Sequence, residues 1–251
     1  MKLLKSVIES NLKEGDVSCY LYDSIDSTNN EAKRLLGKSD TPFFIVSESQ
    51  TSGRGRMGRS FFSPESSGIY LSYAYKPKGT VGDSIAVTSA AAVAVARAIK
   101  EIIGLECKIK WVNDIYFAGK KVSGILTEAV GSHIIIGIGI NVSTKSFPED
   151  IKSIAGSVGN EQTDRNILIA SVINNLQKLI NELPQRTFLE EYRKLSLIIG
   201  ERITYTKNGV KCDGVAIDVD ENGFLTVKKD DGTEEILSSG EISLRLNYGP
   251  A

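Results

Sequence analysis

The stretch Gly53-Arg54-Gly55-Arg56-Met57-Gly58-Arg59 is the part of the sequence that says most about the fold. Its glycines free the backbone, so that several N–H groups can point at one anion. Its arginines supply forked donors that match phosphate or carboxylate oxygens. The segment is therefore predicted to be a mobile anion-gripping loop. A solvated basic loop and an Arg/Gly RNA-binding segment are the alternatives.

The charge balance bears on these alternatives. The 251 residues include 30 lysines and arginines against 31 acidic residues, for a net charge of -1. Such a chain has no overall field that would gather nucleic acid or an anionic membrane, so any polyanion site must be local. RNA-binding Arg/Gly segments are typically repeated in basic, disordered chains, whereas this one occurs once in a neutral sequence.

The cellular compartment is predicted from three features that the sequence lacks: a disulfide framework, a signal peptide and a transmembrane stretch. Its cysteines, Cys19, Cys107 and Cys212, are odd in number and widely spaced, which argues against a disulfide framework or a zinc site. The first residues carry frequent charges and do not resemble a signal peptide. No stretch is long and apolar enough for a transmembrane helix. We expect a cytoplasmic protein without membrane contact.

Around the loop, the apolar pattern alternates between strands and helices. Strands are expected at residues 19–22, 43–46 and 68–76, and helices at residues 30–36 and 83–103. Polar loops are expected after the first two strands, at residues 23–30 and 47–50. Residues 108–142 indicate a β-meander with turns at 118–120 and 131–132. Two further helices are predicted at residues 164–183 and 187–195.

The sequence pattern changes after Gly200: short predicted strands are separated by the dipeptides Asn208-Gly209, Asn222-Gly223 and Asp231-Gly232. These dipeptides are strong hairpin signals. About 50 residues built in this way predict a small separate β-barrel.

Two more segments could take part in chemistry. Lys110-Trp111-Val112-Asn113-Asp114 ends a predicted strand, where the lysine could stabilise a reacting phosphate and Asp114 or Asn113 could lie near Mg²⁺. The alternative is a surface strand with the tryptophan ring in the core. Residues 137–142, Gly-Ile-Gly-Ile-Asn-Val, are not a dinucleotide fingerprint, because no third glycine or helix follows. Their glycines indicate either a close approach to the backbone or a bulge.

Together these segments resemble the biotin protein ligase family. The family's loop pattern Gly-Arg-Gly-Arg-x-Gly-Arg is matched at residues 53–59, and its Lys-Trp-Pro-Asn-Asp motif at residues 110–114, with Val112 in place of proline. Residues 121–128 and 137–142 look like its next two signatures, and Ser27-Thr28-Asn29 looks like its first. The Val112 departure changes backbone stiffness and no reacting group.

The resemblance implies an α+β fold: a class II aminoacyl-tRNA synthetase-like catalytic domain, with a mixed sheet flanked by helices, plus a C-terminal SH3-like β-barrel. We expect the biotin- and ATP-binding domain at residues 1–198 and the SH3-like domain at residues 199–251. The order of strands and helices, inferred independently above, agrees with this implication.

The resemblance also implies roles for particular residues. Ser27, Thr28, Asn29 and Gln50 fall where the family binds the biotin head, and Gly53, Arg54, Gly55 and Arg56 fall in the loop that closes over biotin and the adenylate. Lys110 matches a lysine that contacts the biotin carboxylate and the α-phosphate, and with Arg56 it is the catalytic candidate. Segments lining the biotin tail and adenine contain Gly124, Gly139 and Asn141. Asp114 is the candidate Mg²⁺ ligand. His133, beside a turn, is expected at the surface.

The implied activity uses ATP and Mg²⁺ to make biotinoyl-AMP and pyrophosphate from biotin, and then transfers biotin to a lysine of a biotin carboxyl carrier domain. A lipoate protein ligase shares this adenylate chemistry and is the nearest alternative. About 20 residues precede the first expected strand, which is too short for the helix-turn-helix of family members that also act as repressors. We therefore expect the form without a DNA-binding domain, with a homodimer plausible by resemblance.

Overall fold

A seven-stranded mixed sheet forms the centre of the larger unit, in the order β1-β2-β3-β7-β6-β5-β4. The computed structural model describes residues 2–13, 17–38, 42–77, 84–207, 209–240 and 242–244. β1 and β2 are parallel, and the other pairs in this sheet are antiparallel. The strands are β1 (Ser18–Ile25), β2 (Phe43–Gln50), β3 (Gly68–Tyr75), β4 (Lys108–Lys110), β5 (Asp114–Phe117), β6 (Lys120–Val130) and β7 (His133–Asn141).

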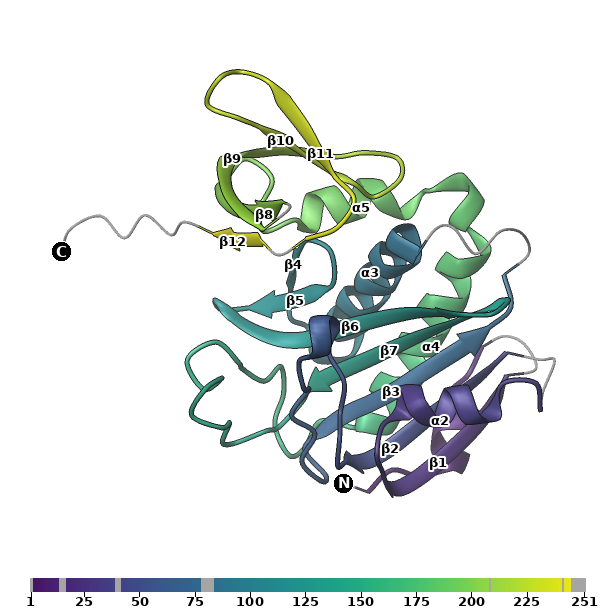
Figure 1. Cartoon of the computed structure of the whole chain (residues 1–251). Coiled ribbons are helices and arrows are strands. Elements are labelled where there is room, and N and C mark those ends of the chain that lie inside the picture. The colour runs from purple at the N-terminus through teal and green to yellow at the C-terminus, as the bar shows by residue number, and fades with distance from the viewer. Residues whose placement is uncertain are drawn as a thin grey trace.

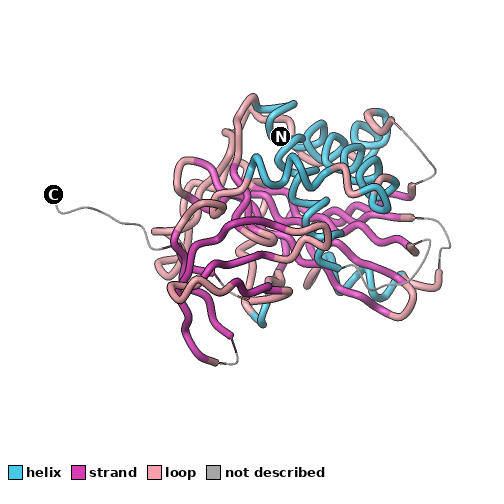
Figure 2. Tube along the Cα trace, turned by 90° about the horizontal axis from the view of Figure 1, so that it is seen from above, coloured by secondary structure: helices cyan, strands magenta, loops and turns pink. Residues whose placement is uncertain are grey.

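Helices cover the two faces of this sheet unequally. The alanine-rich α3 (Ser84–Ile103) packs against α4 (Arg165–Asn181) and lies over β4 to β7, because its small buried side chains permit close approach. α2 (Thr28–Leu35) lies on the opposite face, against β2, β3 and β7 (Figures 1 and 2). The short α1 (Lys5–Ser10) packs on α4, which Asp164 caps through its carboxylate. The face that carries α2 is left with room for a site.

The C-terminal residues form a second, antiparallel sheet in the order β11-β10-β9-β8-β12, beside α5 (Phe188–Leu195) (Figure 1). Its strands are β8 (Arg202–Lys207), β9 (Val210–Val219), β10 (Leu225–Lys228), β11 (Glu234–Leu237) and β12 (Ile242–Leu244). One apolar cluster of buried side chains runs from Leu3 through both sheets to Ile242. The mixed sheet with flanking helices and the C-terminal antiparallel sheet confirm the expected α+β fold.

Contacts across the junction are specific. The indole N–H of Trp111 donates to the carbonyl of Gly223, at 2.8 Å, in the turn between β9 and β10. Arg193 on α5 donates from Nε to the carbonyl of Val219 in β9, at 2.7 Å. The expected division between residues 198 and 199 stays a prediction, although the shared core means that the two sheets stabilise each other.

Most elements follow the sequence pattern, with two differences. β2 continues through residues 47–50, which were expected to form a polar loop, and β1 and α2 occupy most of residues 23–30. The reason is that the polar side chains in β2 are paired: buried Glu48 accepts from the N–H of Leu3 and forms an ion pair with buried Arg165. Two residues of expected elements, Asp83 and Asn208, lie outside the described residues.

The glycines of β7 resolve an open alternative. The pairing of β7 with β3 and β6 shows no register shift at Gly137 or Gly139, so the strand has no bulge there. Within the part of the chain that the structure describes, no helix is both long and apolar enough to cross a membrane.

Candidate active site

A cavity of about 340 Å³ lies on the α2 face of the large sheet. Its lining comes from the β1–α2 junction, the loop at residues 54–62, the β4–β5 turn, β6, β7, residues 147–155, and Gly240, Ile242 and Ser243 near β12. Every candidate residue from the sequence except Gly53 lines it. Gly53 is buried just behind, where a Cβ would overlap the carbonyl of Phe61. The structure thus gathers segments that are more than 100 positions apart in the chain into one site.

One end of the cavity is lined by the uncharged polar side chains of Thr28, Asn29 and Gln50, and we call these three, with Ser72 buried behind them, the neutral end. Gln50 accepts from the backbone N–H of Thr28 at 2.8 Å through its Oε1. The Ser72 hydroxyl lies 2.7 Å from Thr28 Oγ1 and 2.5 Å from Asn29 Oδ1. Because these groups hold one another, their remaining donors and acceptors point in fixed directions.

Glycines make room beside the neutral end. A Cβ on Gly137 would overlap the amide of Asn29, and one on Gly139 would overlap the ring of Phe61. These two side chains therefore lie directly on the backbone of β7, which is the close approach that the sequence left as one of two options. Phe61 also packs edge-on against Tyr70, with ring centroids 6.4 Å apart. Ser27, almost fully buried, and Asn141 complete this part of the lining.

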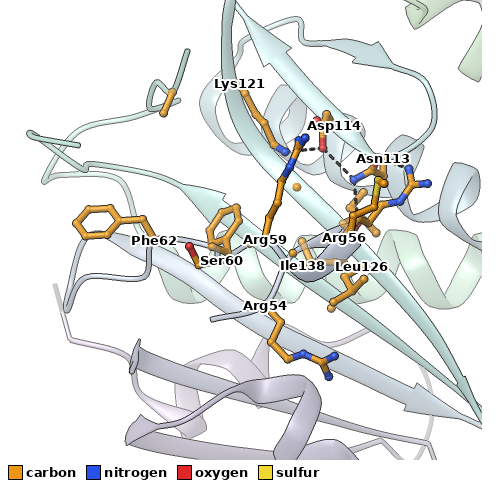
Figure 3. Close-up of a pocket in the computed structure, with 18 of the residues that line it drawn as sticks. Arg54, Arg56, Arg59, Ser60, Phe62, Asn113, Asp114, Lys121, Leu126 and Ile138 are labelled. Carbon is orange, nitrogen blue, oxygen red and sulfur yellow. Dashed lines mark hydrogen bonds and ion pairs between the residues drawn. The ribbon is translucent and has the colours of Figure 1, made fainter. Parts of the chain in front are cut away.

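The other end, which we call the charged end, holds Arg56, Lys110, Asn113, Asp114 and Lys121. Arg56 donates to Asn113 Oδ1 at 2.8 Å, and Asn113 Nδ2 donates to Asp114 at 2.9 Å. Lys121 Nζ lies 2.7 Å from the same carboxylate (Figure 3). Cations thus outnumber carboxylates here, since Asp114 is the one acidic side chain among the described residues that line the cavity. Such a site favours a bound anion.

Both interpretations of the motif at residues 110–114, a lysine at the site and a tryptophan ring in the core, agree with the structure. Lys110 lines the cavity, and its Nζ lies 5.8 Å from the centroid of the Tyr116 ring. The Trp111 ring is buried against the C-terminal sheet, as the alternative reading expected. The Trp111–Val112 peptide bond is cis.

Lys121 begins the motif at residues 121–128, and no role was predicted for it. The structure places it in the cavity lining. The signal that could have placed it is the hairpin turn at residues 118–120, which sets β5 against β6 and brings Lys121 near Asp114. The backbone of Lys121 is also held from outside the sheet: its N–H donates to Ile154 and its carbonyl accepts from Gly156. Residues 147–155 are thereby fixed beside the cavity.

Glu128 is a second residue without an assigned role. In β6, it accepts from Asn29 Nδ2 at 2.9 Å and pairs with Lys33 at 2.9 Å and with Arg54 at 3.2 Å. Burial raises the pKa of this carboxyl, but the hydrogen bonds from Lys33 and Asn29 and the charges of Lys33 and Arg54 outweigh it, and the net pKa is below its usual value.

His133 begins β7 at the far end from the cavity and is half-exposed, within 3.5 Å of the Ser132 hydroxyl. Among the described ranges of the chain, no cluster of three or more histidine, cysteine, aspartate or glutamate side chains could hold a metal ion. Asp114 is the one carboxylate among the described residues that line the cavity.

Comparison with known proteins agrees with this geometry. Residues 21–141 match the Biotin/lipoate A/B protein ligase family, and residues 198–245 match the biotin protein ligase C terminal domain. The bifunctional ligase/repressor BirA of Bacillus subtilis is 33% identical over 258 residues, covering 95% of this chain and 78% of that protein. The biotin–[acetyl-CoA-carboxylase] ligase of Mycobacterium tuberculosis is 30% identical over 230 residues, covering 86% of this chain and 85% of that protein.

Among solved structures, the biotin protein ligase from Aquifex aeolicus in complex with biotin and ATP superposes with a TM-score of 0.79 at 30% identity, covering 91% of this chain and 98% of that one. The same order of motifs, the same two-part fold and relatives matched along most of their length lead to one conclusion. This chain belongs to the biotin protein ligase family and is a biotin ligase enzyme.

Proposed function

We propose that this enzyme joins biotin to AMP at the expense of ATP and then passes the biotinoyl group to a lysine of a biotin carboxyl carrier domain. The observation that supports this most is the division of one cavity into a neutral end and a charged end. Biotin has the same division, with an uncharged ureido ring at one end and a carboxylate at the other.

The neutral end suits the ureido ring, which needs donors and acceptors together. Thr28, Asn29 and Gln50 supply both. The amide of Asn29 is oriented by its bonds to Glu128 and Ser72, and that of Gln50 by its bond to the Thr28 N–H. Gly137, Gly139 and Phe61 would line the biotin tail, since all three line the cavity and the apolar Phe61 ring lies directly on β7 at Gly139. Gly124, which pairs with Gly139 across β6 and β7, and Asn141 belong to the same lining.

The charged end suits the reaction itself. A carboxylate oxygen of biotin attacks the α-phosphorus of ATP, the bond to the pyrophosphate oxygen breaks, and two anions must approach each other. Lys121, Lys110 and Arg56 would offset the charge that builds up on the phosphorus oxygens. In the second step a carrier lysine amine attacks the acyl carbon and AMP leaves.

Mg²⁺ is part of this proposal only as a companion of ATP. Mg²⁺ is usually held by one or two carboxylates plus substrate phosphates, and Asp114 offers one such carboxylate in the cavity. Its present partner Lys121 would then turn toward the phosphate. The ion would lower the charge repulsion between biotin and ATP.

Pyrophosphate exchange into ATP tests the proposal, run with biotin and, in parallel, with lipoate. We expect exchange with biotin, and mass spectrometry of the mixture should detect bound biotinoyl-AMP. Exchange with lipoate in place of biotin would replace the proposal with the nearest alternative. The expectations of no DNA binding, of a homodimer and of a cytoplasmic location remain predictions.

A further inference from the structure

Glu128 contacts two parts of the active site, the neutral end and the arginine loop. Its Oε2 accepts from Asn29 Nδ2 at 2.9 Å, in the neutral end, and its Oε1 lies 3.2 Å from Arg54 Nη1, in the loop at residues 53–59. Lys33 of α2 adds a third contact, at 2.9 Å from Oε1. One carboxylate therefore contacts both the neutral end, where biotin would bind, and the loop that would cover it.

The contact with Asn29 sets the direction of that amide. With Nδ2 donating to Glu128 and Oδ1 accepting from the Ser72 hydroxyl at 2.5 Å, the amide has one orientation that satisfies both neighbours. In the reversed orientation the amide oxygen would face the Glu128 carboxylate, which has no proton to donate. A ligand therefore meets Asn29 already oriented.

The contact with Arg54 has a different character, because it can be broken at low cost. The Arg54 side chain is 42% exposed, so it returns readily to water, and it also donates to Asn30 Oδ1 at 3.3 Å. Glu128 keeps Lys33 and Asn29 when Arg54 leaves, so its carboxylate is not stranded in the protein. Figure 3 shows Arg54 directed away from Arg56 and Arg59, which extend toward the Asp114 side.

From this geometry we propose that Glu128 is a positioning residue that latches the loop through Arg54 while holding the Asn29 amide in its binding orientation. The proposal rests on the proposed function and adds how the loop retains the adenylate until a carrier arrives. A latch of this kind suits a loop that must open in every turnover, because one ion pair breaks and no buried charge loses all its partners.

Glu128→Gln separates the two contacts. The glutamine carbonyl can still accept from Asn29, but the charge that holds Arg54 is gone. We expect biotin affinity to stay within about twofold, and biotinoyl-AMP to escape roughly threefold to tenfold faster, the range for a partly exposed, hydrogen-bonded ion pair. Glu190→Gln is the matched control, because its exposed carboxylate pairs with Lys194 on α5, outside the cavity.

A double variant decides whether the effect passes through Arg54. If Glu128 acts as a latch, Glu128→Gln should add little to adenylate escape in an Arg54→Gln background. The same fold increase in both backgrounds would overturn the proposal, as would unchanged escape in the single variant. The wild-type protein keeps the two hypotheses apart: if it forms no biotinoyl-AMP, the function is wrong, whereas retention by wild type and Glu128→Gln alike refutes only the latch.

Proteolysis gives a second readout that needs no turnover. Without ligand, trypsin should cut after Arg54, Arg56 or Arg59 faster in Glu128→Gln than in wild type, because the loop loses its attachment to β6. Equal rates of cleavage in the two proteins would show that the Arg54 contact does not restrain the loop.

Discussion

The two ends of the cavity differ in charge and in exposure to water. At the neutral end, Thr28, Asn29 and Ser72 are 4%, 3% and 0% exposed, and each is hydrogen-bonded to another member. At the charged end, the side chains of Asp114 and Lys121 are 21% and 31% exposed. Hydrogen bonds to an uncharged ring discriminate well when water is excluded and the partners are already oriented. Several cations can share a small site only where water still reaches them.

This comparison teaches that recognition and chemistry are placed at different depths. Biotin would enter with its ring toward the buried end, so that its carboxylate stops where ATP and cations meet. Changes at the neutral end should therefore alter biotin affinity, and changes at the charged end should alter the rate of adenylation. The following predictions test that division, beginning with the largest expected effect.

Replacing a cation at the charged end should give the largest loss. For Lys121→Ala, and likewise for Lys110→Ala, we expect pyrophosphate exchange to fall about 10²- to 10³-fold, or about 2.7–4 kcal/mol, by analogy with other groups that stabilise developing charge. Biotin affinity should change far less. Lys120→Ala is the matched control, because this neighbouring lysine bonds the carbonyl of Ser153 and does not line the cavity. Near-normal exchange in folded Lys121→Ala would remove that lysine from the chemistry.

Removing a hydroxyl at the neutral end should have the reverse signature. Ser72→Ala leaves Asn29 Oδ1 and Thr28 Oγ1 without their shared partner, which costs about 1–3 kcal/mol of stability. We expect the biotin Kd to rise several-fold, because the Asn29 amide is then no longer held in its binding orientation. At saturating biotin, kcat should stay within about twofold. Calorimetry and pyrophosphate exchange measure the two quantities. Ser171→Ala, a buried serine bonded to Glu101 on the far side of the sheet, controls for loss of a hydroxyl as such.

How far the sequence predicts this site depends on whether a residue acts within a local motif. Ser27, Thr28, Asn29, Arg56 and Lys110 lie in short patterns that could be recognised from the chain alone, and the structure brings them together. Ser72 lies in the strand expected at residues 68–76, but nothing local to it shows that its hydroxyl meets Asn29.

The residues that were missed act through pairing between strands. Lys121 meets Asp114 because β6 pairs with β5, and Glu128 meets Asn29 because α2 lies over this part of the sheet. Most of the fold was predictable because alternation and turn residues are local signals of where strands begin and end. The prediction was wrong where a strand contains a buried charge such as Glu48, because a run of polar residues is typical of a loop.

The support of the charged end by the C-terminal sheet can also be tested. Trp111→Phe keeps an aromatic side chain but replaces the buried indole with a smaller ring and removes the N–H that bonds Gly223, leaving that carbonyl buried without this donor. We expect a loss of about 1–3 kcal/mol, or roughly 2–4 °C in Tm for each kcal/mol in a chain of this length. Because Asn113 and Asp114 follow two and three residues later, exchange should fall a few-fold, with biotin Kd nearly constant. A loss in biotin affinity equal to the loss in exchange would show that the two ends are not independent.

Added salt should have the smallest effect, and it should weaken binding at the charged end more than at the neutral end. The Debye length falls from about 10 Å at 0.1 M to about 3 Å at 1 M, so added KCl weakens attraction between ATP and the exposed cations of the charged end. The KM for ATP should therefore rise several-fold over that range. Biotinol, which has a hydroxyl in place of the carboxylate of biotin, would contact the cavity through neutral groups, and its Kd should remain within about twofold. Biotin itself should lie between the two, because one of its ends is charged. If biotinol and ATP lose affinity by the same factor, salt is acting on the whole protein and the division into a neutral and a charged end does not describe how the cavity binds.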